Sequence, residues 1–152
     1  MANPYLLPAL RLGPLTVQHL VEAVSESRYD ELTDPGRFTL REAVAHLADW
    51  EPILLDRIRL AAEQPGSTIV AYDETALCER GGYGSTEPRD QAQLFIARRE
   101  RTIEYITSAL DGRWSNEAVH QGRGPMTVAD LVNLLVGHDM YHIEHLAQFL
   151  TS

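Results

Sequence analysis

Four stretches of the chain carry apolar residues at the three- and four-residue spacing of an α-helix, and this pattern constrains the fold more than any other feature. The stretches cover residues 14–27, 39–64, 88–110 and 127–150. Glycine- and proline-containing segments separate them. Helices of one chain bury their apolar faces against each other, so the sequence predicts an all-α four-helix bundle in which residues 1–152 form one domain.

Two of the predicted helices begin with a recognisable capping pattern. Thr39 and Glu42 have the spacing of a capping box, in which each side chain bonds the other residue's backbone N–H. Thr127 and Asp130 provide a cap and a first-turn acid for the last helix. We therefore expect the second helix to begin just after Thr39 and the fourth just after Thr127.

Two prolines and one long connection shape the remaining expectations. Pro14 is expected in the first turn of the first helix, where a missing N–H is tolerated. Pro52 lies inside the second helix and predicts a kink after Glu51. Residues 64–88 show only weak periodicity, so we expect a long loop with one helical turn, of the kind that often borders a functional site.

The third predicted helix contains a run of charged residues. Arg98, Arg99, Glu100 and Arg101 are expected to lie largely on its solvated face. The apolar residues expected to face the core are Leu94, Ile96, Ala97, Ile103, Ile106 and Leu110.

The charge balance excludes some classes of function. There are 22 acidic and 13 basic side chains, a formal charge of -9, and no basic cluster that could follow a phosphate backbone, which disfavours nucleic-acid binding. No apolar run approaches the length of a bilayer span, and the first residues lack the pattern of a secretion signal. A single cysteine allows no internal disulfide. We expect a cytoplasmic protein that does not contact membranes.

The last predicted helix carries three histidines at helical spacing. His138, His142 and His145 are separated by four and three residues, so their side chains project from one face. Leu131 and Leu135 extend the same face, which is therefore the side that packs into the bundle. Imidazoles buried there need partners, either hydrogen bonds or a metal ion.

A metal ion could be shared between this helix and the second one. Histidines at positions i and i+4 can chelate one ion, and His46, on the apolar side of the second helix, is the best candidate for a third ligand. His138 and His145 are about 10 Å apart along the helix axis, which favours His138 and His142 as the chelating pair. Spacing alone leaves open that these are hydrogen-bonded core histidines.

Two carboxylates near His46 could orient its imidazole. Glu42 and Asp49 lie four residues before and three residues after it. A surface role is the alternative for each.

Two sequence motifs resemble those of the DinB/YfiT-like superfamily. They are the stretch LREAVAHLAD at residues 40–49 and HDMYHIEHLAQ at residues 138–148, and the similarity extends to paired arginines in the third helix and to GPMT before the fourth. The chain departs from the pattern of many relatives at His145, where they carry glutamine. Gln148 follows one turn later.

The resemblance implies a four-helix bundle whose three matching histidines, His46, His138 and His142, bind a divalent nickel or zinc ion. It also implies metal-dependent thiol chemistry, because some relatives transfer low-molecular-weight thiols of the bacillithiol or mycothiol type to electrophiles. In that reaction Tyr141 or His145 could exchange a proton with a small-molecule substrate. Relatives are commonly dimers, so the resemblance also implies a homodimer.

Other functions remain open at this point. A metal-bound hydroxide would make the protein a hydrolase, and one relative is described in this way. A metal site closed by a fourth protein ligand, such as His145, would instead favour a non-catalytic stress protein that binds a metal or a ligand. The remaining candidate role of His145 is to hold or orient a metal ligand.

Overall fold

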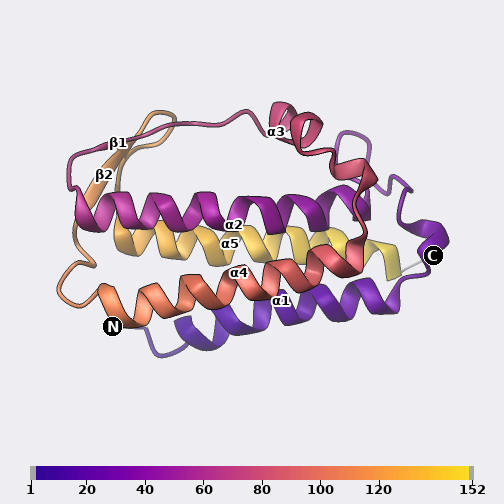
Figure 1. The fold of residues 1–152 in the computed structure, drawn as a ribbon, viewed down its shortest axis with the longest axis horizontal. Coiled ribbons are helices and arrows are strands. Elements are labelled where there is room, and N and C mark those ends of the chain that lie inside the picture. Colours follow the sequence, from indigo (N-terminus) through magenta and orange to yellow (C-terminus); the bar gives the residue numbers. More distant parts are fainter. Residues whose placement is uncertain (1–2, 151–152) are drawn as a thin grey trace.

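Four long helices lie side by side along the longest axis of the molecule in the computed structural model, which describes residues 3–150 (Figure 1). The predicted four-helix bundle is therefore confirmed. The helices are α1 (Leu6–Ala23), α2 (Leu40–Glu63), α4 (Pro88–Ala109) and α5 (Val128–Ala147). Within the described part of the chain, none of the helices is long and apolar enough to cross a membrane.

The helices do not follow a simple up-and-down order. α1 packs against α4 and α5, and α2 packs against the same two helices, so α1 and α2 lie diagonally opposite. α2 and α4 run in one direction and α1 and α5 in the other (Figure 1). Because α2 and α4 are parallel neighbours, the chain between them must return along the whole of α2. That helix has 24 residues and a length of about 36 Å.

The return segment explains the long connection seen in the sequence. It contains β1 (Thr68–Ile69), α3 (Glu74–Gly81) and the 3-10 turn η2 (Tyr83–Ser85). It runs along the outer side of α2 (Figure 1). The segment therefore holds more regular structure than the single helical turn that we expected.

A small sheet packs beside one end of α2 (Figure 1). β2 (Glu117–His120) and β3 (Gly124–Thr127) form an antiparallel hairpin, and β1 pairs in parallel with β2. These strands lie in segments predicted only as connections, because two- and four-residue strands leave almost no periodicity in a sequence. Two further 3-10 turns are η1 (Glu26–Arg28) and η3 (Gln148–Leu150).

The predicted capping box is present at Thr39, and the predicted cap at Thr127 also forms a capping box. The Thr39 side chain accepts from the Glu42 backbone N–H, while the Glu42 carboxylate accepts from the Thr39 N–H. Thr127 and Asp130 make the same reciprocal pair at the start of α5. These local signals locate the starts of the two helices that carry the histidines.

The position predicted for Pro14 is wrong. α1 begins at Leu6, so Pro14 lies inside the helix and leaves the Leu10 carbonyl without its intrahelical donor. Arg99 of α4 donates from Nη1 to this oxygen at 3.0 Å. A contact between helices thus satisfies the carbonyl, which allows α1 to continue through the proline.

Pro52 has the same arrangement in α2. The helix continues through it from Leu40 to Glu63, and the orphaned carbonyl is that of Ala48. Arg98 donates from Nη1 to this oxygen at 2.5 Å. Neighbouring arginines of α4 therefore satisfy the carbonyls that two prolines expose in two different helices.

The outward orientation predicted for Arg99 is wrong as well. Its side chain is only 2% exposed, whereas Leu94 and Ala97, expected in the core, are exposed. The buried face of α4 repeats at three- and four-residue intervals and consists of Ala92, Phe95, Arg99, Thr102 and Ile106. The sequence has this spacing, but it is hard to recognise as a buried face because a charged residue, Arg99, stands in its middle.

Buried polar residues divide the core at the middle of the bundle. One apolar cluster, which includes Leu10, Ile58 and Leu131, lies towards the sheet. The other, which includes Val17 and Leu146, lies towards the opposite end. The polar residues between them are His46, Glu51, Arg99, Thr102, Asp139 and His142.

Candidate metal centre

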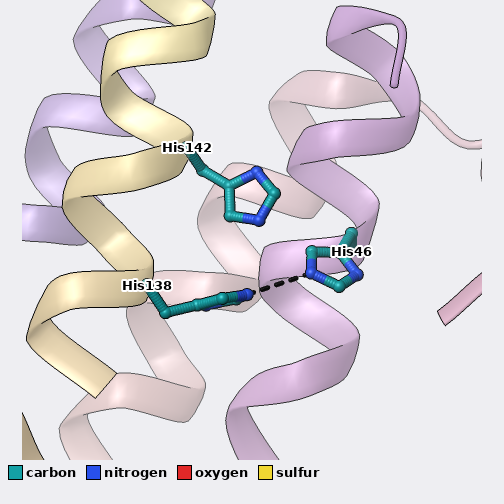
Figure 2. A group of neighbouring side chains, drawn as sticks. All are labelled: His46, His138 and His142. Atoms are coloured by element: carbon teal, nitrogen blue, oxygen red, sulfur yellow. Dashed lines mark hydrogen bonds between the residues drawn. The ribbon is translucent and has the colours of Figure 1, made fainter. Parts of the chain in front are cut away.

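Three histidines from two helices converge within this polar layer. His46 comes from α2, and His138 and His142 come from successive turns of α5. One ring nitrogen of each lies within 4.8 Å of the others, and the Nε2 atoms of His46 and His138 are 3.0 Å apart (Figure 2). The structure thus brings together the three residues predicted as metal ligands, which we call the histidine triad.

Burial keeps these imidazoles neutral. His46 is fully buried and His142 nearly so, while His138 is half-buried. Loss of water lowers the pKa of His46 to about 3, of His138 to about 4 and of His142 to about 2, with the neighbouring histidines adding to the effect at His46 and His142. All three rings therefore present the neutral form that binds a metal ion.

The spacing of the triad fits a transition-metal ion. Two nitrogens bound to one zinc ion at about 2.0–2.1 Å in a tetrahedral arrangement are about 3.3 Å apart, close to the separation of the His46 and His138 Nε2 atoms. Within residues 3–150, the Nδ1 atoms of His46, His138 and His142 are buried and have no hydrogen-bond partner. Three imidazole donors suit zinc and nickel better than calcium or magnesium, which prefer oxygen ligands.

A buried ionic cluster lies beside the triad. Arg99 forms a bidentate pair with Glu51, at 2.7 and 2.8 Å, and a second with Asp139, at 2.7 and 3.0 Å. Its fifth N–H bonds the Leu10 carbonyl, and Thr102 donates to Glu51 at 2.6 Å. Although burial alone would lower the pKa of Arg99, these carboxylates raise it.

This ionic cluster joins all four long helices at the level of the triad. Glu51 lies on α2, Arg99 on α4 and Asp139 on α5 next to His138, while the accepting carbonyl belongs to α1. Every N–H of the guanidinium has an acceptor. Because the pairs are bidentate, they fix the relative positions of α2 and α5, from which the triad histidines project.

Aromatic rings surround His46. The ring centroids of Phe38, Trp50 and Tyr83 lie 5.1, 5.5 and 6.3 Å from that of His46. Tyr83 comes from the return segment and donates its hydroxyl to Asp49 at 2.7 Å. The return segment thus covers the triad and helps to exclude water from it.

The two carboxylates considered as partners of His46 have other roles. Asp49 accepts from Tyr83, and Glu42 belongs to the capping box of α2. In the part of the chain that the structure describes, neither forms a hydrogen bond to His46. The positions near His46 along the helix were therefore a poor guide to its contacts.

Two small cavities flank the triad. One, of about 130 Å³, is lined by His138 and Trp50, and the other, of about 170 Å³, by His142 and Phe38. Glu74, at the start of α3, contributes to both. The largest cavity described, of about 390 Å³ between α1 and α4, has no triad histidine in its lining.

The two residues predicted to exchange protons both line the cavity beside His142. Tyr141 is 56% exposed, and its ring centroid lies 5.1 Å from that of His142, with the Arg37 guanidinium above it. His145 is buried, its Nε2 has no hydrogen-bond partner within residues 3–150, and burial lowers its pKa. It is not among the histidines whose ring nitrogens converge.

Sequence reasoning missed two residues beside the triad. Arg57 of α2 and His120 of β2 both line the cavity next to His138. Arg57 is 8% exposed and His120 6% exposed. His120 had no helical partner in the sequence, and only the hairpin brings it to α2.

Comparisons with known proteins identify relatives that are described as metal-dependent hydrolases. A Bacillus subtilis protein named "Putative metal-dependent hydrolase YfiT" is 24% identical over 136 residues, which are 89% of this chain and 76% of the relative. An Oceanobacillus iheyensis protein with the same description is 24% identical over 142 residues, or 93% of this chain and 79% of its own length.

A solved structure shows the same fold. It is described as "YfiT from Bacillus subtilis is a probable metal-dependent hydrolase with an unusual four-helix bundle topology". It superimposes with a TM-score of 0.87 at 23% identity, over 95% of this chain and 83% of that one. The sequence model of the DinB superfamily matches residues 9–146. The chain belongs to the DinB superfamily.

Proposed function

We propose that the protein binds one divalent ion, nickel or zinc, on His46, His138 and His142 and transfers a low-molecular-weight thiol to a small electrophile. The observation that carries the proposal is the convergence of three neutral imidazoles, two buried and one half-buried, between two separate cavities. A bound ion would lower the pKa of a thiol or water at its open position and so supply a nucleophile at neutral pH.

The chain's own residues prepare the site for such an ion. Neutral imidazoles leave the positive charge of the ion uncompensated, which keeps it a strong electrophilic centre. The ionic cluster of Glu51, Arg99 and Asp139 carries a net negative charge beside the triad, which favours a cation there. Aromatic rings on the His46 side limit the access of water.

The two cavities support a reaction with two substrates. One adjoins His138 and the other adjoins His142, so a thiol and an electrophile could approach the triad from different sides. A hydrolase whose second substrate is water needs only one such cavity. The arrangement therefore favours thiol transfer over hydrolysis.

Two residues of the His142 cavity suit proton transfer. His145 is neutral because burial lowers its pKa, and its unpartnered Nε2 can take a proton from the thiol or return one to the product. The exposed Tyr141 ring stands against His142 at the mouth of the same cavity, where its hydroxyl can serve as the alternative donor. We assign the proton-transfer role to these two residues.

Metal-dependent hydrolysis is the second candidate. The descriptions of both curated relatives favour it, and the same triad would serve it with water as the nucleophile. A purely structural metal site is less well supported, because no fourth protein ligand joins the triad within residues 3–150.

The first experiment tests the metal site. Protein purified without an affinity tag or chelator is analysed for metal content, together with His142→Ala and with His19→Ala, which changes an exposed histidine of α1. We expect about one ion per chain in the wild type and in His19→Ala, and a large loss in His142→Ala. A wild-type protein that neither contains nor takes up nickel or zinc would refute the proposal.

The second experiment separates the two reactions. The metal-loaded protein is assayed with bacillithiol or mycothiol and monobromobimane as the electrophile, and separately with p-nitrophenyl acetate in the absence of thiol. Thiol transfer predicts metal-dependent turnover only in the first assay, with a slower rate in His145→Ala at unchanged metal content. Turnover only of the ester would favour hydrolysis.

A further inference from the structure

Arg57 is a buried cation that forms no ion pair in the described part of the chain. It is 8% exposed, and its hydrogen bond runs from Nη2 to the Val70 carbonyl at 3.0 Å. Its Nε is buried and has no acceptor within residues 3–150. Burial lowers the pKa of Arg57, and the opposing effects of Tyr72 and Glu74 do not offset it, whereas the carboxylates around Arg99 raise the pKa of that more deeply buried residue. A buried cation without an ion-pair partner is costly, and a ligand can take up its unused N–H groups.

The Trp50 ring lies between the Arg57 guanidinium and the triad. Its central carbon is 5.2 Å from the Trp50 ring, and that ring lies 5.5 Å from His46 and 6.3 Å from His138. On its other side, the guanidinium is 5.5 Å from the Tyr72 ring. Arg57, Trp50, Tyr72 and His138 all line the cavity of about 130 Å³. A small molecule in this cavity would therefore contact both the charge and the triad.

The same cavity is rich in hydrogen-bond donors. His120 accepts from the Gly122 N–H through Nδ1 at 3.0 Å, so the neutral ring carries its proton on Nε2. The Trp50 Nε1–H is buried and has no acceptor among the described residues. Arg123 adds a second positive charge to the lining.

The charged residues of the lining are two arginines, Arg57 and Arg123, and one acidic residue, Glu74. The lining is therefore positive in a protein whose net charge is -9. Local positive charge together with donors is the complement of a carboxylate or phosphate group.

We propose that Arg57, assisted by His120 and Arg123, binds an oxyanion group of the substrate beside the triad. This inference rests on the proposed function, because it assigns the substrate class as a small molecule with a carboxylate or phosphate group. Holding that group at Arg57 leaves the rest of the molecule to extend past Trp50 towards His138. Arg57 is thus a specificity-determining residue in the cavity beside His138.

The test uses succinate and inorganic phosphate as probes at constant ionic strength. Binding is followed by NMR through the two indole Nε1–H resonances, of which Trp50 lines the cavity and Trp114 serves as an internal control. We expect saturable shifts of the Trp50 resonance with one probe or both, while Trp114 stays unchanged. Their relative affinities distinguish a carboxylate site from a phosphate site.

Matched variants locate the charge that matters. Arg57→Gln should weaken binding at least about tenfold, whereas Arg59→Gln, which removes an exposed charge from the same helix, should leave it unchanged. Arg123→Gln, at an exposed position, should give a smaller loss, and it keeps the inference testable if Arg57→Gln fails to fold. Equal losses in Arg57→Gln and Arg59→Gln, or no Trp50 shift with either probe, would overturn the inference.

Metal content separates this inference from the proposed function. Arg57→Gln should retain the wild-type amount of metal, because Arg57 contacts none of the triad nitrogens. If the wild-type protein binds the anion but no metal, the proposed function is refuted and the oxyanion site is supported. Metal binding without anion binding would refute the oxyanion site alone.

Discussion

Arg99 and Arg57 are both buried arginines, but their surroundings differ. Arg99 has an acceptor for each of its five N–H groups, and two of its partners are carboxylates. Arg57 has one backbone acceptor and aromatic neighbours. The protein itself therefore satisfies every N–H of Arg99, whereas Arg57 keeps N–H groups that can bind a ligand. This contrast separates a residue that holds the fold together from one that can bind substrate.

Removal of the Arg99 side chain should strongly destabilise the protein. Arg99→Ala leaves Glu51 and Asp139 buried without a counter-charge, and such changes cost about 3–5 kcal/mol in the free energy of unfolding. Arg101→Ala, at an exposed position two residues further along α4, should change it by less than about 0.5 kcal/mol. Urea unfolding measures both values. Equal effects of the two variants would show that the ionic cluster does not stabilise the fold.

The metal-free protein should lose stability as the pH falls below about 6.5, the ordinary pKa of histidine. The folded-state pKa values of His46, His138 and His142 are about 3, 4 and 2, so at pH 5.5 the unfolded chain binds protons that the folded chain does not. The free energy of unfolding then falls with decreasing pH, by up to about 1.4 kcal/mol per pH unit for each histidine that stays neutral.

Urea unfolding in the presence of a chelator, between pH 7.5 and 5.5, measures this slope. His46→Gln removes one of the titrating groups and should flatten the dependence. His19→Gln, at an exposed site, should retain the wild-type slope. A His46→Gln slope equal to that of the wild type would contradict the assignment.

Among the elements, α1 approaches the polar layer closely because of Gly13. A Cβ atom at Gly13 would lie 2.4 Å from the Asp139 Oδ2, and Arg99 holds that carboxylate in place. The next residue is Pro14, which exposes the carbonyl that Arg99 bonds. The Gly13-Pro14 pair thus fits α1 to the ionic cluster.

Gly13→Ala and Gly137→Ala should have opposite effects. The Gly13 change forces α1 away from Asp139 and should cost about 1–3 kcal/mol in the free energy of unfolding. Gly137 lies inside α5, where an added Cβ meets nothing within 4 Å, so alanine should stabilise the helix by about 0.5–1 kcal/mol. Thermal unfolding of both variants measures the difference. Similar stabilities for the two would refute the close approach at Gly13.

For the molecule as a whole, the triad connects α2 to α5 at the middle of the bundle. These helices are packed neighbours and carry separate ligands, so a bound ion would cross-link them. An ion that binds only the folded protein stabilises it by an amount that grows with the logarithm of the ratio of its free concentration to its Kd.

Zinc or nickel should therefore raise the Tm of the chelator-treated protein. At a free concentration 100 times the Kd, the expected gain is about 2.7 kcal/mol. His46→Ala should abolish most of the shift because it removes the ligand of α2, and His19→Ala should preserve it. Calorimetric scans with and without metal provide the measurement, and an undiminished shift in His46→Ala would place the ion elsewhere.

Much of this architecture was predictable from the sequence because its determinants are local. The capping pairs that start α2 and α5 each lie within four residues, and the apolar periodicity of each helix lies within one segment. The four-residue spacing of His138 and His142 placed both on one helix face. The residues predicted as ligands were therefore the ones that the structure brings together.

What only the tertiary structure decided depends on contacts between distant segments. Arg99 is buried because it has partners on three other helices. One of these contacts satisfies the Leu10 carbonyl, which allows α1 to begin before Pro14 and to continue through it. The meeting of Arg57 with His120 requires the hairpin to fold against α2. Local periodicity carries no information about such pairings, because a residue's neighbours along the chain do not determine which side chains meet it across the core.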